Sequence, residues 1–204
     1  MKEQNKTQKA ILDAAKHEFL EKGFRGASLR NIVKTAKVTT GAFYGYYESK
    51  EQLFDALVKE PSEYIMNEFN RTQEEFKKLS PEKQNEEMGK VSGRSMIKWI
   101  DYILDNADAF KLILKCAEGT GYENYIHKMV ETEIRATHDF VHLMNENGKS
   151  FKTADENLEH ILISGMFSAY FEMALHDIPR DAAHIYVEQL NEFYVAGWAK
   201  IMGC

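Results

Sequence analysis

Hydroxyl, aromatic and basic side chains gather between Ser28 and Lys50, where the sequence reads SLRNIVKTAKVTTGAFYGYYESK. Hydroxyl and amine donors of this kind bind phosphate oxygens, and small residues at the start of a helix let its backbone approach the edges of base pairs. We therefore expect this segment to contact double-stranded DNA. The candidate contact residues are Ser28, Arg30, Lys37, Thr39, Thr40, Gly41, Ala42, Tyr44, Tyr46 and Lys50.

Two short helices separated by a tight turn are expected to position these side chains. The hydroxyl of Ser28 is suited to cap a helix that runs to about Ala36, and Thr39 is suited to cap a second helix. Lys37 and Val38 are left as the turn between them. In a helix-turn-helix of this kind the second helix lies in the major groove, with its N-terminal residues at the base edges.

Two further spacings fix the ends of this unit. Val38 and Phe43 flank the cap as a hydrophobic staple, which sets the angle at which the chain enters the second helix. Ser49 and Gln52 form a capping box that begins the next helix. The segment is thus expected to fold as a compact three-helix unit with the helices before and after it.

Three stretches of the sequence resemble a known family, with the same order and spacing of residues. They are Ile11-Leu12-Asp13-Ala14-Ala15 with Phe19, Gly23 and Phe24; Ser28-Leu29-Arg30-Asn31-Ile32; and Thr39-Thr40-Gly41-Ala42-Phe43-Tyr44 followed by Lys50-Glu51-Gln52-Leu53-Phe54. Residues from about 8 to 58 resemble the N-terminal DNA-binding domain of the TetR (tetracycline-repressor-like, TetR/AcrR) family of bacterial transcriptional regulators. The resemblance implies an all-α fold, with a helix-turn-helix domain at residues 1–58 and a helical domain for effector binding and dimerisation at residues 59–204.

The sequence departs from the pattern of the family at two places. The turn position before Val38 is usually glycine in the family, whereas here it is Lys37, whose side chain costs on the order of 1 kcal/mol if the residue is left-handed. A phosphate contact by the lysine can offset that cost. The usual aromatic-His-Phe ending is replaced by Gly45-Tyr46-Tyr47, so the Tyr46 hydroxyl is expected to take over the phosphate contact of the histidine.

Charge is distributed unevenly along the 204 residues, of which 44% are hydrophobic and 28% are charged. The net charge is −6, yet residues 1–50 hold ten Lys/Arg and five Asp/Glu, a balance of +5 that leaves −11 for the rest. Basic charge therefore concentrates where DNA contact is expected. The sequence has no apolar run of about 18 residues and no signal-peptide pattern, which predicts a cytoplasmic protein with no membrane partner. Cys116 and Cys204 are expected to be reduced thiols.

The rest of the chain reads as helices, since it holds only three prolines and none of them interrupts the apolar periodicity of the long segments. A helix from Ser49 to about Phe76 is expected to kink near Pro61, and the polar stretch Lys77–Gly93 is interpreted as a loop and helix entry. Further helices are predicted around 96–103, around 110–114, and over 122–147, 154–176 and 180–202.

The last two predicted helices carry apolar stripes at spacings of three and four residues. Two such helices from each of two subunits make a four-helix bundle, and in the resembling family this is how subunits dimerise. A homodimer also matches a palindromic operator. The alternative is that the stripes face the core of their own subunit. The candidate interface residues are Leu162, Gly165, Met166, Ala169, Met173, Val187, Leu190, Tyr194, Gly197 and Ile201.

Large apolar and aromatic residues between these two regions are candidates for an effector pocket. The resemblance implies a small-molecule effector, here apolar or aromatic, whose binding releases the operator by population shift. Ordinary core packing is the alternative for each residue. The candidates are Trp99, Tyr102, Phe110, Met129, Phe140, Phe167, Tyr170 and Phe171.

The sequence gives less support for a metal site or an enzyme than for a DNA-binding regulator. His138 and His142 lie one helical turn apart, but no cysteine or third histidine follows at ligand spacing, so no metal site is predicted. Glu-x-x-His pairs of di-iron bundles and the usual nucleophile or phosphate-loop motifs are missing as well. We therefore predict a DNA-binding repressor without enzyme activity or cofactor. The alternative is a helical protein that binds an effector or metal but no operator.

Overall fold

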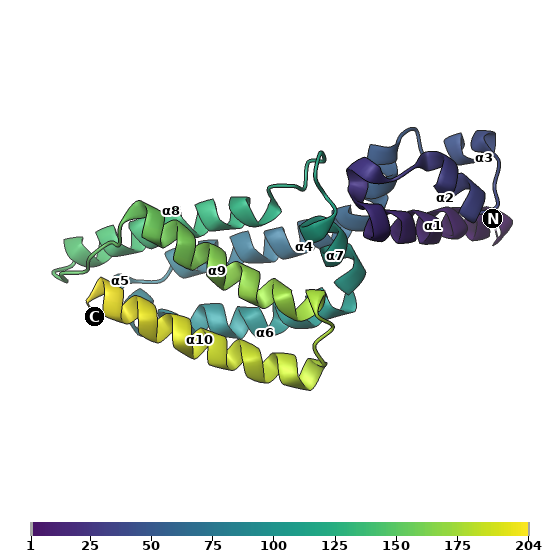
Figure 1. The fold of residues 1–204 in the computed structure, drawn as a ribbon. Coiled ribbons are helices and arrows are strands. Elements are labelled where there is room, and N and C mark those ends of the chain that lie inside the picture. The colour runs from purple at the N-terminus through teal and green to yellow at the C-terminus, as the bar shows by residue number, and fades with distance from the viewer. Residues whose placement is uncertain (1, 204) are drawn as a thin grey trace. The chain divides into compact units, whose positions relative to one another are not determined.

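The structure, a computed structural model, describes residues 2–203, with the side chains of all of these except residues 2–5 and Ser92. Within this range the regular secondary structure is entirely helical, which confirms the predicted all-α class (Figure 1). Cys204 lies outside the described residues. The helices are α1 (Lys2–Gly26), α2 (Leu29–Thr35), α3 (Thr40–Tyr44), α4 (Lys50–Lys77), α5 (Pro81–Glu87), α6 (Lys90–Asp105), α7 (Ala107–Lys115), α8 (Tyr125–Glu146), α9 (Glu156–Leu175) and α10 (Arg180–Met202).

The chain forms two compact units that are not contiguous in sequence. The first consists of the residues up to Glu63 together with Asn106–Tyr125, and the second of Tyr64–Asp105 and the residues from Ile126 onward. Helix α4 contributes residues to both units. The functional division at residue 58 stays a prediction.

In the first unit, α1 packs against α2 and α7. Apolar residues of α1 recur at helical spacing and bury one face, on which the rings of Phe19, Phe24 and Phe54 meet with centroids 5.2–5.9 Å apart. Gly23 adopts a φ of 69° and breaks the regular helix, which turns the last residues of α1 toward α2. This core holds the short helices α2 and α3, which are too short to be stable alone.

The second unit contains five long helical segments and the short helix α5. Helix α10 packs against both α6 and α9, and α6 also packs against α9, as the ribbon shows (Figure 1). Helix α8 is joined to α4 through the Gln73–Glu133 hydrogen bond and to α9 through the His138–Glu159 contact. No helix among the described residues has both the length and the apolar character that crossing a bilayer requires.

One predicted feature of the helix boundaries needs correction. The polar stretch after Lys77 is not simply a loop, because it contains α5. The oxygen of Ser80 accepts the Lys83 N–H at 3.4 Å and Pro81 occupies the first helical position, which together are a helix-start signature that the polar composition masked. Helix α4 contains Pro61, and the hydroxyl of Ser62 donates to the Lys59 carbonyl at 2.8 Å. The kink expected near Pro61 stays a prediction.

Candidate nucleic-acid interface and ligand cavity

Helix α3 presents its N-terminal edge to solvent, as the sequence predicts. The Oγ1 atom of Thr39 accepts the N–H of Ala42 at 3.1 Å, which confirms the predicted cap. Thr39, Thr40, Gly41 and Ala42 are all exposed, whereas Phe43 on the opposite side is 1% exposed. The small residues at the start of α3 are thus exposed, while the ring of Phe43 anchors the helix in the core.

Basic and aromatic residues flank this edge. Lys37 is exposed and adopts a φ of 55°, so the turn is left-handed at a position where glycine is free of strain. Arg30 is exposed as well. Tyr44 is 55% exposed and its ring contacts Phe43 edge-on, while Tyr46 is half-buried. Arg30, Lys37 and Tyr44 thus expose their side chains close to α3 in the sequence.

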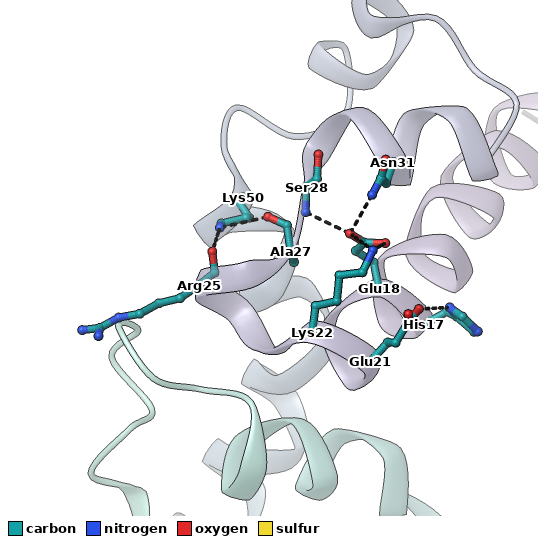
Figure 2. A network of polar contacts seen from close by, with 9 residues as sticks. All are labelled: His17, Glu18, Glu21, Lys22, Arg25, Ala27, Ser28, Asn31 and Lys50. Carbon is teal, nitrogen blue, oxygen red and sulfur yellow. Dashed lines mark hydrogen bonds and ion pairs between the residues drawn. The ribbon is translucent and has the colours of Figure 1, made fainter.

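Ser28 departs from its predicted capping role. It stands at the N-cap position of α2, but its hydroxyl makes no capping hydrogen bond. The carboxylate of Glu18 in α1 does the capping instead: Oε1 accepts the Ser28 N–H at 3.1 Å and the Asn31 side-chain amide at 3.2 Å (Figure 2). The cap of α2 therefore comes from a different helix, which fixes α2 against α1.

The Glu18 carboxylate is ionised in this position for a physical reason. Burial raises the pKa of Glu18, but the hydrogen bond from Ser28 N–H and the contacts with Lys22 and Asn31 lower it further, so the net pKa lies below its usual value. An anion at the start of α2 also suits the partial positive charge of a helix N-terminus. The sequence signal was a single glutamate within the apolar stripe of α1, between Ala15 and Phe19.

Lys50 has intramolecular partners in place of the phosphate expected from the sequence. Its ammonium donates to the carbonyl oxygens of Ala27 at 3.2 Å and Arg25 at 3.4 Å (Figure 2). It also donates to the carbonyl oxygen of Phe24 at 2.7 Å. The same nitrogen lies 4.5 Å from the centre of the Phe24 ring. Lys50 thus satisfies carbonyls at the end of α1. A phosphate contact by this residue stays a prediction, and the phosphate would have to compete with these three carbonyl oxygens for the ammonium.

The second unit encloses a cavity of about 140 Å³ between α4, α6, α8, α9 and α10. Its walls are mainly aromatic and aliphatic, with few polar groups, which is the usual character of a small-molecule site. The lining residues are Phe69, Thr72, Gln73, Phe76, Met88, Gly89, Val91, Met96, Trp99, Glu133, Ala136, Thr137, Phe140, Ile163, Met166, Tyr170, Asn191, Tyr194, Val195, Trp198 and Met202.

Three of the predicted effector residues, Trp99, Phe140 and Tyr170, line this cavity. The other five do not, and the structure corrects the expected lining at these positions. Phe110 is fully buried in α7, which belongs to the first unit, and Tyr102 stacks on Tyr64 with ring centroids 3.9 Å apart. The remaining three are at most 2% exposed and fill the core: Met129, Phe167 and Phe171.

Glu133 is the acidic group on the cavity wall, and sequence reasoning did not identify it. The side-chain amide of Gln73 donates to its Oε2 atom at 2.6 Å. Burial raises the pKa of Glu133 to about 7, and the Gln73 hydrogen bond lowers it by less than burial raises it. The signal in the sequence was again a carboxylate that shares a helix face with Val130 and Phe140.

Helices α9 and α10 expose a broad apolar surface in the described chain. Ile161 is 65% exposed and Phe193 is 70% exposed, although both are large apolar side chains. Leu158, Ile185 and Tyr186 are also exposed, and Gly165 and Gly197 lie open on the same helices. We call these seven residues, together with the half-buried Leu162, Ala169, Leu190 and Ile201, the α9–α10 face.

The predicted interface overlaps only partly with this face. Met173 and Val187 are 4% and 0% exposed, so they pack in the core of their own unit and are removed from the candidate interface. Met166 and Tyr194 line the cavity. Sequence reasoning missed the five large exposed side chains because α9 is apolar on several sides and its periodicity does not single out one stripe.

His138 and His142, the pair considered as metal ligands, do not share a common contact. His138 Nε2 lies 2.6 Å from Oε2 of the buried Glu159, while His142 Nδ1 lies 3.4 Å from Glu146. The two rings therefore have different partners on different helices. Among the described residues, no three His, Cys, Asp or Glu side chains are grouped so as to hold a metal ion.

Sequence similarity to known proteins covers part of this chain. Residues 11–57 match the family model described as bacterial regulatory proteins, tetR family. The HTH-type transcriptional regulator UidR of Escherichia coli (strain K12) is 35% identical over 63 residues, which are 31% of this chain and 32% of the relative. The uncharacterized HTH-type transcriptional regulator YdgC of Bacillus subtilis (strain 168) is 42% identical over 52 residues, 26% of this chain and 27% of the relative. The chain thus matches about a third of the length of these curated relatives or less.

Solved structures extend the likeness of the fold to nearly the whole chain. A bacterial regulatory protein in the tetR family from Rhodococcus RHA1 is similar with a TM-score of 0.59, at 17% identity over 97% of both chains. The transcriptional regulator FadR from Bacillus subtilis in complex with stearoyl-CoA is similar with a TM-score of 0.55, at 17% identity over 92% of this chain and 97% of that chain. Residues 11–57 are therefore similar to the helix-turn-helix domain of the bacterial regulatory proteins, tetR family, and the fold of the chain is similar to that of solved regulators of this family.

Proposed function

We propose that this protein is a homodimeric transcriptional regulator that binds a palindromic operator and releases it when a small molecule binds, acting as a repressor. The observation that carries the proposal is the N-terminal edge of α3, where three small exposed residues, Thr40, Gly41 and Ala42, follow the Thr39 cap. Such an edge fits the major groove, and two exposed basic residues, Arg30 in α2 and Lys37 in the turn before α3, are suited to contact phosphates.

The α9–α10 face supports the dimer. An apolar surface that includes side chains as exposed as Ile161 and Phe193 is unfavourable in water unless a partner covers it. A second copy of the same face satisfies this requirement with two-fold symmetry, and two-fold symmetry matches two operator half-sites. The cavity of the second unit supports an effector site, because an apolar space with a few polar groups is the usual form of a ligand pocket.

Binding selection with the purified full chain tests the proposal. Double-stranded DNA from its own promoter region and a randomised duplex library are offered at fixed salt, and bound sequences are read out. We expect an enriched palindrome with nanomolar-range affinity and two subunits per site. A protein that binds all duplexes equally weakly would instead support the alternative of an effector- or metal-binding protein without an operator.

The Lys37→Gly variant is expected to separate stability from DNA binding. Glycine relieves the left-handed backbone at this position, so the free energy of unfolding should rise by up to about 1 kcal/mol. Loss of the ammonium should weaken operator binding and reduce the slope of log affinity against log salt by roughly 1. Urea unfolding and salt-dependent fluorescence anisotropy measure the two effects. Lys37→Asn, which tolerates the same backbone without the charge, is the matched control, and an unchanged slope in both variants would exclude a phosphate contact.

The Thr40→Ala variant is expected to change sequence preference more than non-specific affinity. Thr40 is exposed at the first position of α3, where a side chain reaches base edges. Competition binding across operator variants should show a changed ranking at one or two base pairs in each half-site. An equal loss of affinity on every sequence would make Thr40 a phosphate contact only.

A further inference from the structure

We propose that the cavity of the second unit selects a small organic cation, an amine or quaternary ammonium with an apolar body, whose charge pairs with Glu133 among the surrounding aromatic rings. This inference rests on the proposed function, because it names the ligand class of the proposed effector site. It assigns Glu133 as the residue that determines specificity.

The position of Glu133 carries the proposal. Its carboxylate has one hydrogen-bond partner in the cavity, the Gln73 amide at 2.6 Å, so most of its acceptor capacity is available to a ligand. Two tryptophans and two tyrosines, Trp99, Trp198, Tyr170 and Tyr194, stand on the same walls. Faces of such rings attract cations, and the attraction grows where water is excluded.

The charges around the cavity exclude the opposite ligand class. Among the described residues that line it there is no lysine, arginine or histidine, so a carboxylate or phosphate would enter without a counter-charge. A neutral hydrocarbon would leave Glu133 and its amide partner facing an apolar surface. A cation satisfies the carboxylate and the rings together. The cavity of about 140 Å³ is close to the roughly 150 Å³ that accommodates benzene, which favours a ligand built on a single ring.

The ionisation of Glu133 gives a second test of the proposal, the dependence of ligand affinity on pH. The other titratable groups on the cavity walls are Tyr170 of α9 and Tyr194 of α10, whose pKa values are raised by burial and which stay neutral at physiological pH. Between pH 6 and 8 only Glu133 changes charge on these walls, because burial raises its pKa to about 7. A cation binds the ionised form, so its affinity should increase as pH rises through 7, and binding below pH 7 should release a proton.

The test uses three ligands of one shape class and the full-length protein without DNA. Benzyltrimethylammonium keeps its charge at every pH, neopentylbenzene is its neutral isostere, and phenylacetate is an anion. Calorimetric or fluorescence titration should rank the cation first by about tenfold or more at pH 8. Its affinity should fall by about tenfold between pH 8 and pH 6, which follows from a single group with a pKa of about 7.

Glu133→Gln is the decisive variant, and Glu131→Gln on the exposed side of the same helix is its control. Glu133→Gln should remove both the preference for the cation and the pH dependence while neopentylbenzene still binds. Glu131→Gln should change neither, and thermal unfolding verifies that both variants are folded. Equal binding of cation and isostere, tighter binding of phenylacetate, binding of none of the three, or an unchanged pH profile in Glu133→Gln would each overturn the proposal.

Operator binding, measured separately, distinguishes this failure from failure of the proposed function. If the wild-type chain binds its operator but shows no charge preference, the ligand class is wrong and the regulator assignment stands. If the chain prefers the cation through Glu133 but binds no operator, the ligand class is supported and the regulator assignment fails.

Discussion

Replacing Gly197 with glutamate is expected to give a folded monomer whose operator affinity is lower by on the order of a hundredfold or more. Gly197 is exposed in the interior of α10, and a Cβ atom built at this position meets no other atom within 4 Å. The subunit therefore has room for the new side chain. Glutamate is also a better helix former than glycine by roughly 1 kcal/mol, so α10 should gain stability.

The loss arises at the α9–α10 face. If a second copy covers this face, the glutamate brings a carboxylate without a partner into an apolar interface, which costs several kcal/mol of association. Each half-site then has to bind one subunit alone, with too few contacts for specific binding. Analytical ultracentrifugation and operator titration measure the two consequences.

A matched control for Gly197→Glu is Lys98→Glu, which introduces the same carboxylate at an exposed position of α6 outside the α9–α10 face. It should leave both the molecular mass and operator binding near wild type. Phe193→Ser removes the most exposed of the large apolar side chains and should weaken association without adding charge. A dimeric Gly197→Glu protein with normal operator affinity would show that this face does not join the subunits.

Replacing Lys50 with methionine is expected to lower the free energy of unfolding by roughly 1–2 kcal/mol. The ammonium donates to three carbonyls at the end of α1, and hydrogen bonds to a charged group contribute about 1.5–3 kcal/mol. Against this, a cation at the first position of α4 opposes the helix dipole, which costs about 0.3–1 kcal/mol. The carbonyl contacts are the larger effect, and methionine preserves the packing on Phe24.

Urea unfolding of Lys50→Met, with Lys34→Met as the control, checks this balance. Lys34 lies exposed on α2, so its replacement should change stability by less than about 0.5 kcal/mol. A different outcome is also informative. If Lys50→Met unfolds like wild type and instead reduces the salt slope of operator binding by roughly 1, Lys50 acts on phosphate as its position in the sequence suggests.

Local features of the first unit could be predicted from the sequence because they depend on neighbours along the chain. The Thr39 cap is confirmed, and Ser49 Oγ accepts the Gln52 N–H at 3.2 Å as a capping box requires. The reciprocal bond differs slightly, since the Gln52 side chain accepts the Glu48 N–H. The Glu18 cap could not be predicted, because it joins residues ten positions apart on different helices.

For the second unit, the sequence predicted the helices, but it did not predict which of their residues line the cavity and which pack in the core. The bounds of α10 agree with the predicted 180–202, since Pro179 precedes it and Gly203 ends it in a left-handed conformation. Residue type alone, however, does not separate core from cavity wall: Phe140 lines the cavity, whereas Phe167 packs edge-on against Phe69. That distinction depends on where five helices meet, which no single helix pattern contains.

The discontinuity of the first unit has a consequence for synthesis on the ribosome. Phe24 N–H donates to the Cys116 carbonyl at 2.8 Å, the Tyr122 hydroxyl donates to Asp55, and the Tyr125 hydroxyl donates to the Ser62 carbonyl at 2.9 Å. These partners leave the exit tunnel long after α1 to α3, so the helix-turn-helix emerges before the residues that complete its core. Domains usually fold as they emerge, whereas we expect this one to complete its fold only after residue 125 has emerged. A nascent chain stalled short of that point should remain sensitive to protease throughout its first 63 residues.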